Sequence, residues 1–355
     1  MNNTPQFDST TFDAGSGKKI RSYFSRIGMG LTLMLLSSVG IQLAASWLIK
    51  KYMPSLIESD WLIWVLSLVP MYIVGLPIML VYAKKVPAAK PEKHKMKFGH
   101  WMIAMLMCFG VLYAGNYFGT FLSTLIDTLR GKETTGIVAD ALAMSSPLFS
   151  FIAAVIIAPI LEELIFRRFI INRTRAYGEK TAVVFSALLF GLYHGNIQQF
   201  FYAFGLGLIF GFIYVRTGKV RYTVFLHMVI NFFGSIVGMF VLEHVDMEAV
   251  MEFYDQMMES GYMQSIMENA DAYNEYLAHL TELMPDLLIM SAYSTLLSGM
   301  AMAGVILMLV MRRRFTYKPA EFQIPGDRVG STVYMNIGVF TLIIVCAGLM
   351  VYALM

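Results

Sequence analysis

Apolar runs about 20 residues long recur along this chain of 355 residues, and no other feature constrains its fold as much. A helix of about 20 apolar residues is long enough to cross the hydrocarbon core of a bilayer. The composition agrees, because 57% of the residues are hydrophobic, 14% are charged, and the mean hydropathy is +0.61. Soluble domains rarely have such values. The sequence therefore predicts an all-α fold, a polytopic membrane helix bundle.

We expect about nine transmembrane helices. The apolar runs lie roughly at residues 27–49, 61–83, 100–126, 148–170, 181–197, 199–216, 221–242, 287–311 and 332–354. The fifth and sixth runs are short and almost continuous, which favours a tight helical hairpin around Gly195 and Asn196. The expected organisation is an N-terminal segment (1–26), a first group of membrane helices (27–126), a core (148–242), an acidic segment (243–286) and C-terminal membrane helices (287–355).

Lysine and arginine gather in five clusters that would all lie on one side of a nine-span protein. The clusters comprise Lys18, Lys19, Arg21 and Arg26; Lys84, Lys85, Lys90, Lys93, Lys95 and Lys97; Arg167, Arg168, Arg173, Arg175 and Lys180; Arg216, Lys219 and Arg221; and Arg312, Arg313, Arg314, Lys318 and Arg328. The positive-inside rule then predicts a cytoplasmic N-terminus and an external C-terminus. The net charge of +3 follows from this bias, so we expect no nucleic-acid partner. The short loops favour a bacterial plasma membrane.

The segment 243–286 has many acidic residues but no lysine or arginine. Methionine, tyrosine and valine recur in it at helical spacing, and Gly261 is expected to divide it into two helices. We expect an external acidic helical hairpin that packs on the membrane surface or over the bundle. A lid over the core is the alternative.

Three polar clusters interrupt the apolar runs of the core. They are Glu162-Glu163 followed by Arg167, Phe190 followed by His194, and His227 followed by Asn231. Ionisable groups in hydrocarbon are costly, and they usually face a bundle interior where they bind or react with something. Three one-turn pairs on neighbouring spans are difficult to explain as separate accidents.

The spacing predicts different roles for the two adjacent glutamates. In a helix, residues four apart share a face, so Glu163 can form an ion pair with Arg167. Glu162 is rotated by about 100° from Glu163 and is left to act as a general base on water. His194 would share in activating the water or protonate the leaving amine. His227 and Asn231 would donate hydrogen bonds to the oxyanion of a tetrahedral intermediate.

The same residues also allow a metal mechanism. His194, His227 and Glu162 would be a zinc set with water in the open position, although the helical metalloprotease signature of two histidines four apart with an intervening glutamate is absent. Zinc is therefore an alternative cofactor. Taken singly, each cluster also has a structural interpretation, such as an interfacial charge group or an interhelical hydrogen bond.

The ordered set Glu-Glu-x-x-x-Arg, Phe-x-x-x-His and His-x-x-x-Asn resembles the motifs of the CPBP family. This family joins CAAX prenyl proteases of the Rce1 type with bacterial bacteriocin-processing and immunity (Abi) proteins. The resemblance covers residues 148–242. It implies a helical bundle with a conical cavity, water activation by Glu162 with His194, an oxyanion site at His227 and Asn231, and support from Glu163 and Arg167. Family names often say metalloprotease.

The sequence thus predicts a membrane-embedded endopeptidase whose partners are the lipid bilayer and a hydrophobic or lipidated peptide. Two alternatives stay open. In a non-catalytic membrane partner, such as a bacteriocin-immunity or transporter-accessory protein, the polar core would only hold the helices together. A proton-coupled carrier would use the glutamates and histidines as a relay.

Overall fold

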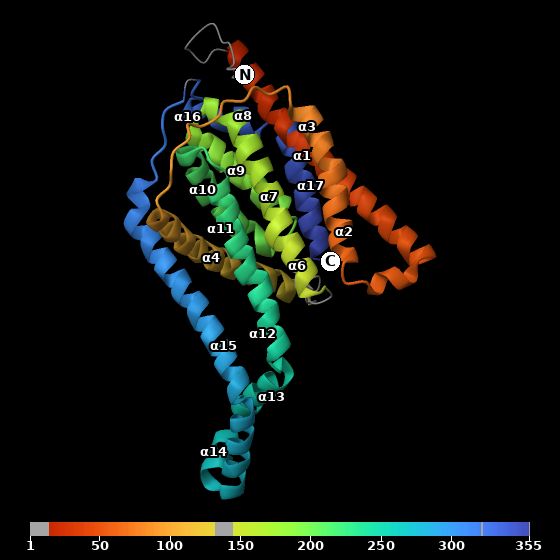
Figure 1. Ribbon diagram of the computed structural model, residues 1–355, viewed down its shortest axis with the longest axis vertical. Helices are drawn as coiled ribbons and strands as arrows, with labels where there is room; N and C mark the ends of the chain where they lie inside the picture. Colours follow the sequence, from red (N-terminus) through yellow and green to blue (C-terminus); the bar gives the residue numbers. More distant parts are fainter. Residues whose placement is uncertain (1–13, 132–144, 321, 355) are drawn as a thin grey trace.

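The computed structural model describes residues 14–131, 145–320 and 322–354, and these form an all-α bundle (Figure 1). The chain is 86% helical, and the described residues contain no strand. Within these described ranges, seven helical segments are long and apolar enough to cross a membrane: Gly15–Tyr52, Leu62–Ala83, Phe98–Arg130, Pro147–Tyr177, Ile197–Thr217, Arg221–His244 and Ala270–Arg314. A bent pair, Gly326–Tyr334 with Ile337–Ala353, gives an eighth candidate with an angle of 66°. The predicted polytopic helix bundle is confirmed.

The fifth predicted span is a helix, but a short one. It corresponds to α9 (Glu179–Tyr193), whose 15 residues extend only about 22 Å, less than the roughly 30 Å hydrocarbon core. A turn at Gly195, where φ is +67°, connects α9 to α10 (Ile197–Thr217). The Asn196 side chain caps α10 by accepting a hydrogen bond from the Gln199 backbone N–H at 2.8 Å. The helical hairpin expected around Gly195 and Asn196 is therefore present.

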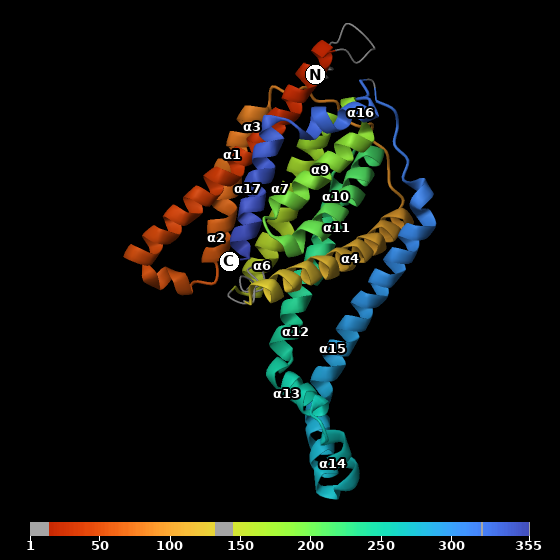
Figure 2. The same ribbon diagram turned by 180° about the vertical axis from the view of Figure 1, so that it is seen from behind.

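Glycines let the helices approach closely. A Cβ on Gly207 of α10 would lie 2.8 Å from the Cα of Ala187 on α9, so only glycine allows this approach. The long helix α4 (Phe98–Arg130) runs obliquely across the bundle and packs against both α10 and α15 (Ala270–Met311) (Figure 2). A Cβ on Gly304 of α15 would collide with the Leu106 carbonyl of α4. Close backbone contact of this kind is typical of membrane helix packing.

A lateral group of helices completes the bundle. On one side, α1 (Ala14–Tyr52) packs against α17 (Ile337–Ala353) and against the span formed by α2 (Leu62–Leu68) and α3 (Leu76–Ala83). The start of α1 and the end of α17 lie at opposite ends of the bundle (Figure 1). The first 13 residues of the predicted segment 1–26 lie outside the described residues, and α1 already begins at Ala14.

Four spans in the described part of the chain contain π-helical turns. They occur at Val69–Gly75, at Phe151–Ile157 and Leu164–Ile171 on both sides of α7 (Ala158–Glu163), at Phe232–Val237 between α11 (Arg221–Asn231) and α12 (Gly238–His244), and at Gly330–Tyr334 before α17. A proline explains one of them, because Pro159 has no N–H and leaves the Val155 carbonyl without its usual helical donor. Such turns are frequent at functional sites.

The acidic segment is helical and divided at Gly261, as predicted. α13 spans Met247–Met258 and α14 spans Tyr262–Glu268, with Gly261 at φ +92° between them. The predicted position over the bundle or as a lid is wrong: the hairpin projects away from the end of the bundle (Figures 1 and 2). The reason is α15, whose 42 residues form one helix about 63 Å long, roughly twice the hydrocarbon thickness.

Candidate active site

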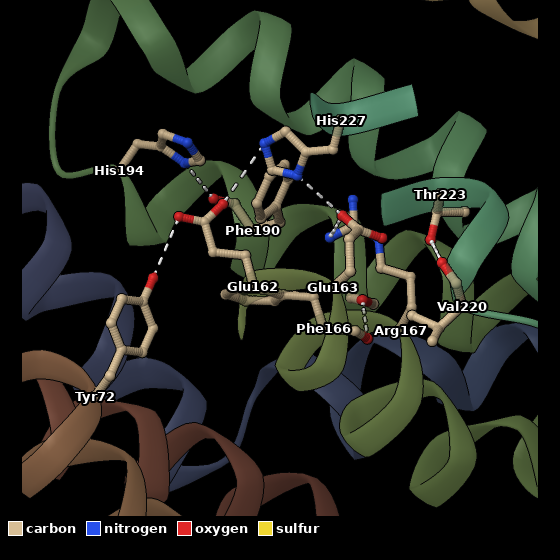
Figure 3. Close-up of polar contacts among 11 residues, drawn as sticks. Tyr72, Glu162, Glu163, Phe166, Arg167, Phe190, His194, Val220, Thr223 and His227 are labelled. Atoms are coloured by element: carbon tan, nitrogen blue, oxygen red, sulfur yellow. Dashed lines mark hydrogen bonds and ion pairs between the residues drawn. The ribbon is translucent and has the colours of Figure 1, made fainter. Parts of the chain in front are cut away.

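The three polar clusters meet between α7, α9 and α11 (Figure 3). Glu162 and Glu163 end α7, Phe190 lies in the last turns of α9, and His194 caps its end. His227 and Asn231 face this group from α11. Three segments separated by tens of residues therefore bring their polar side chains to one place in the interior of the bundle.

Glu163 and Arg167 form a fully buried ion pair. Arg167 Nη1 lies 3.2 Å from Glu163 Oε1, and neither side chain is exposed. The guanidinium carbon also lies 4.3 Å from the ring centre of Phe190 and 5.1 Å from that of Phe210. Cation–π contacts of this kind are strongest where water is excluded. The predicted pair is confirmed, although the helix is π-helical from Leu164 onward.

His227 lies between the two glutamates (Figure 3). Its Nδ1 is 3.2 Å from Glu163 Oε1, and its Nε2 is 3.7 Å from Glu162 Oε2. The second distance is longer than a hydrogen bond. His227 is therefore held through Nδ1, while its Nε2 edge faces Glu162. The rings of Phe190 and Phe210, centred 5.7 and 5.6 Å away, fix the plane of the imidazole.

Glu162 faces a cavity of about 280 Å³, and its side chain keeps 12% of its exposure. The Tyr72 hydroxyl donates to Glu162 Oε1 at 3.4 Å, and the Tyr193 hydroxyl donates to the Tyr72 oxygen at 3.4 Å. Sequence reasoning missed both tyrosines. Tyr193 precedes His194 in the second cluster and could have been noticed. Tyr72 lies 90 residues from Glu162 in another span, and nothing local in the sequence indicates the contact.

His194 and Asn231 line the same cavity as Glu162. His194 Nδ1 is 2.8 Å from the Phe190 carbonyl oxygen. A carbonyl can only accept, so Nδ1 carries the hydrogen and Nε2 is the acceptor of the neutral ring. Asn231 Nδ2 donates to the Ala154 carbonyl at 2.8 Å. That bond uses one amide hydrogen and leaves the second for a ligand.

Most of the remaining cavity wall is apolar. It comes from α2, α4, α10 and α11 and includes Trp64, Leu112, Tyr202, Leu206 and Ile230. An apolar cavity with a few convergent polar groups is the usual form of a ligand site. The arrangement places one carboxylate, two imidazoles and two side-chain amides around a mainly apolar space.

Zinc coordination by His194, His227 and Glu162 stays a prediction. Over the ranges that the structure describes, no three His, Cys, Asp or Glu side chains are arranged to hold a metal. His194 Nδ1 contacts the Phe190 carbonyl and His227 Nδ1 contacts Glu163, so Nε2 is the nitrogen that each ring could offer to a metal.

Comparison with known proteins agrees with the position of the site. Residues 144–233 match the family model of the type II CAAX prenyl endopeptidase Rce1-like proteins. The chain is 30% identical over 141 residues to YdiL of Bacillus subtilis (strain 168), named as a candidate membrane peptidase; the match covers 39% of this chain and 52% of YdiL. It is 35% identical over 104 residues to the membrane-embedded CAAX protease MroQ of Staphylococcus aureus (strain USA300), covering 27% of this chain and 41% of MroQ. No solved structure matches.

The chain thus spans about half the length, or less, of the curated relatives that it matches. The family match includes Glu162, Glu163, Arg167, Phe190, His194, His227 and Asn231. The membrane spans, the buried polar site and the matched segment lead to one conclusion: this is a polytopic membrane protein in which residues 144–233 are similar to the Rce1-like CAAX prenyl endopeptidases.

Proposed function

We propose that the protein is an endopeptidase that hydrolyses a peptide bond in a membrane-associated, hydrophobic or lipidated peptide. One observation carries the proposal. Of the two adjacent glutamates, Glu163 is closed off by Arg167 and His227, whereas Glu162 lines the cavity together with His194 and Asn231. A single accessible carboxylate in an apolar cavity suits a general base better than a structural charge.

The reaction begins with a water molecule between Glu162 and His194. Glu162 accepts a proton from the water while the water oxygen bonds to the carbonyl carbon of the peptide. His194 Nε2, an acceptor in the neutral ring, holds the other water hydrogen. The carbonyl π electrons move to oxygen and give a tetrahedral intermediate. The C–N bond then breaks as the amine nitrogen receives the proton from Glu162.

The oxyanion of the intermediate needs hydrogen-bond donors already in place. Asn231 supplies its second amide hydrogen, since the first is used on the Ala154 carbonyl. His227 can supply Nε2–H when its ring carries both hydrogens, because Nδ1 already donates to the Glu163 carboxylate. Its Nε2 lies too far from Glu162 for a hydrogen bond and is left for the substrate oxygen. Tyr72 keeps the Glu162 carboxylate oriented through the hydroxyl that contacts Oε1.

The substrate class follows from the cavity. Its wall is mainly apolar, so it favours a peptide whose residues flanking the cleaved bond are apolar or carry a lipid. The name of MroQ describes that protein as a CAAX protease. For this chain, the lipid bilayer and a peptide of this class are the partners that we propose.

We also propose a cytoplasmic N-terminus and an external C-terminus, in a bacterial plasma membrane. Three of the five basic clusters meet at one end of the bundle, where Lys95, Arg216 and Arg314 line one pocket. Arg175, from a fourth cluster, donates to the Lys90 carbonyl there. This clustering supports the positive-inside assignment, and the matched relatives are bacterial.

Metal chelation is expected to leave cleavage unchanged. Among the described residues no three His, Cys, Asp or Glu side chains are arranged to hold a metal ion, and the proposed mechanism uses only protein groups and water. The measurement compares the cleavage rate before and after treatment with 1,10-phenanthroline and dialysis. A loss of cleavage that added zinc restores would contradict the metal-free mechanism and support the zinc alternative.

The proposed function is tested by comparing membrane-associated peptides and new N-termini from cells that produce the wild type or Glu162→Gln at equal levels. We expect at least one product that is present only with the wild type and whose flanking residues are apolar or lipidated. Matched samples without any difference under several growth conditions would oppose proteolysis and favour the non-catalytic membrane partner.

A further inference from the structure

A second pocket lies apart from the candidate active site, where the start of α4, the end of α10 and the end of α15 come together. Its volume is about 360 Å³, within the range of small-molecule sites, roughly 300–1,000 Å³. It shares no lining residue with the cavity that contains Glu162. Its inner wall is apolar and includes Ile103, Met107, Ile209 and Ile213.

The mouth of this pocket is basic. Lys95, Arg216 and Arg314 line it together with His94 and His100, and no acidic residue is among the lining residues. Arg216 is already engaged, because its Nη2 lies 3.4 Å from Glu179 Oε2. Lys95 and Arg314 are exposed, and each brings a full positive charge to the rim.

Charge and apolar wall together define the ligand. A basic rim at the end of membrane helices attracts an anionic headgroup, while an apolar wall continuous with those helices removes hydrocarbon from water. We propose that this pocket binds an anionic phospholipid, with the phosphate at Lys95 and Arg314 and the start of an acyl chain along Ile103 and Met107. The proposal is independent of the peptidase site.

The experiment uses the purified full-length protein in detergent micelles, with phosphatidylglycerol and phosphatidylcholine of the same acyl chains as probes and native mass spectrometry as the readout. We expect preferential retention of phosphatidylglycerol. Lys95→Gln and Arg314→Gln are each expected to weaken its binding roughly fivefold. Both side chains are exposed, so both variants should fold.

Arg313→Gln is the matched control, because Arg313 is exposed in the same turn as Arg314 but does not line the pocket. It should bind phosphatidylglycerol like the wild type. An equal loss of phosphatidylglycerol binding in Arg313→Gln and Arg314→Gln would show that the general positive potential of this surface attracts the lipid, and it would overturn the proposed binding in the pocket. Displacement of phosphatidylglycerol by sodium phosphate at equal headgroup concentration would show a soluble-phosphate site and overturn the lipid assignment. Equal retention of the two lipids would overturn the charge argument.

Discussion

Glu162→Gln is expected to lower kcat for peptide cleavage by at least about 10²-fold, because a positioned general base contributes roughly 10²–10⁴-fold. Glutamine has almost the same shape as glutamate, and its amide oxygen can still accept the Tyr72 hydrogen bond. It cannot take a proton from water. The loss should therefore fall on kcat, while KM for the peptide changes little.

The measurement is single-turnover cleavage of the peptide found in cells, with purified wild type and variant in the same micelles. Glu259→Gln is the control, because it removes an exposed carboxylate from the turn after α13, away from the cavity. It should cleave like the wild type. A Glu162→Gln protein that retains most of its kcat would assign water activation to another group and remove the basis of the mechanism.

Arg167→Met is expected to destabilise the fold by about 3–5 kcal/mol, the usual cost of leaving one partner of a buried ion pair uncompensated. Glu163 has no exposure, and its remaining neighbour is His227 at 3.2 Å. The guanidinium also fills the space between Phe190 and Phe210. Methionine restores part of that packing but none of the charge.

Stability is measured by reversible unfolding of the purified protein in mixed micelles. The double variant Glu163→Gln/Arg167→Met removes both charges, so it should be more stable than Arg167→Met. Arg313→Gln, an exposed arginine, should change the free energy of unfolding by less than about 0.5 kcal/mol. A double variant that is less stable than Arg167→Met would show that the pair itself, and not the unpaired carboxylate, determines the stability of the core.

The polar clusters could be recognised from the sequence because each consists of a one-turn pair on a single helix. Local spacing determines which side chains share a face, so the Glu163–Arg167 pair could be predicted, and it persists on the π-helical stretch. The apolar runs predicted the membrane helices for a similar reason, since the length needed to cross a bilayer is a property of one segment. Gly261 separates two helices as expected and lies just before the start of α14.

Contacts between segments could not be derived in this way. The Tyr72 bond to Glu162, the position of Phe210 against Arg167, and the Asn231 bond to Ala154 all join different spans. His227 was expected to act as an oxyanion donor or as a zinc ligand, and its Nδ1 contact with Glu163 was not predicted. The direction of the acidic hairpin depended on the length of one unbroken helix, α15, whose continuity through Pro285 is not evident from composition.

The sequence by itself determined the membrane class, the helical segments and the pairing within each polar cluster, because these depend on hydrophobic length and on helical periodicity. Only the tertiary structure decided which glutamate faces a cavity, which aromatic rings enclose Arg167, and where the two pockets lie. Those outcomes depend on how helices from distant parts of the chain pack against one another. Helix packing is set by the fit of many side chains at once, and no single segment contains that information.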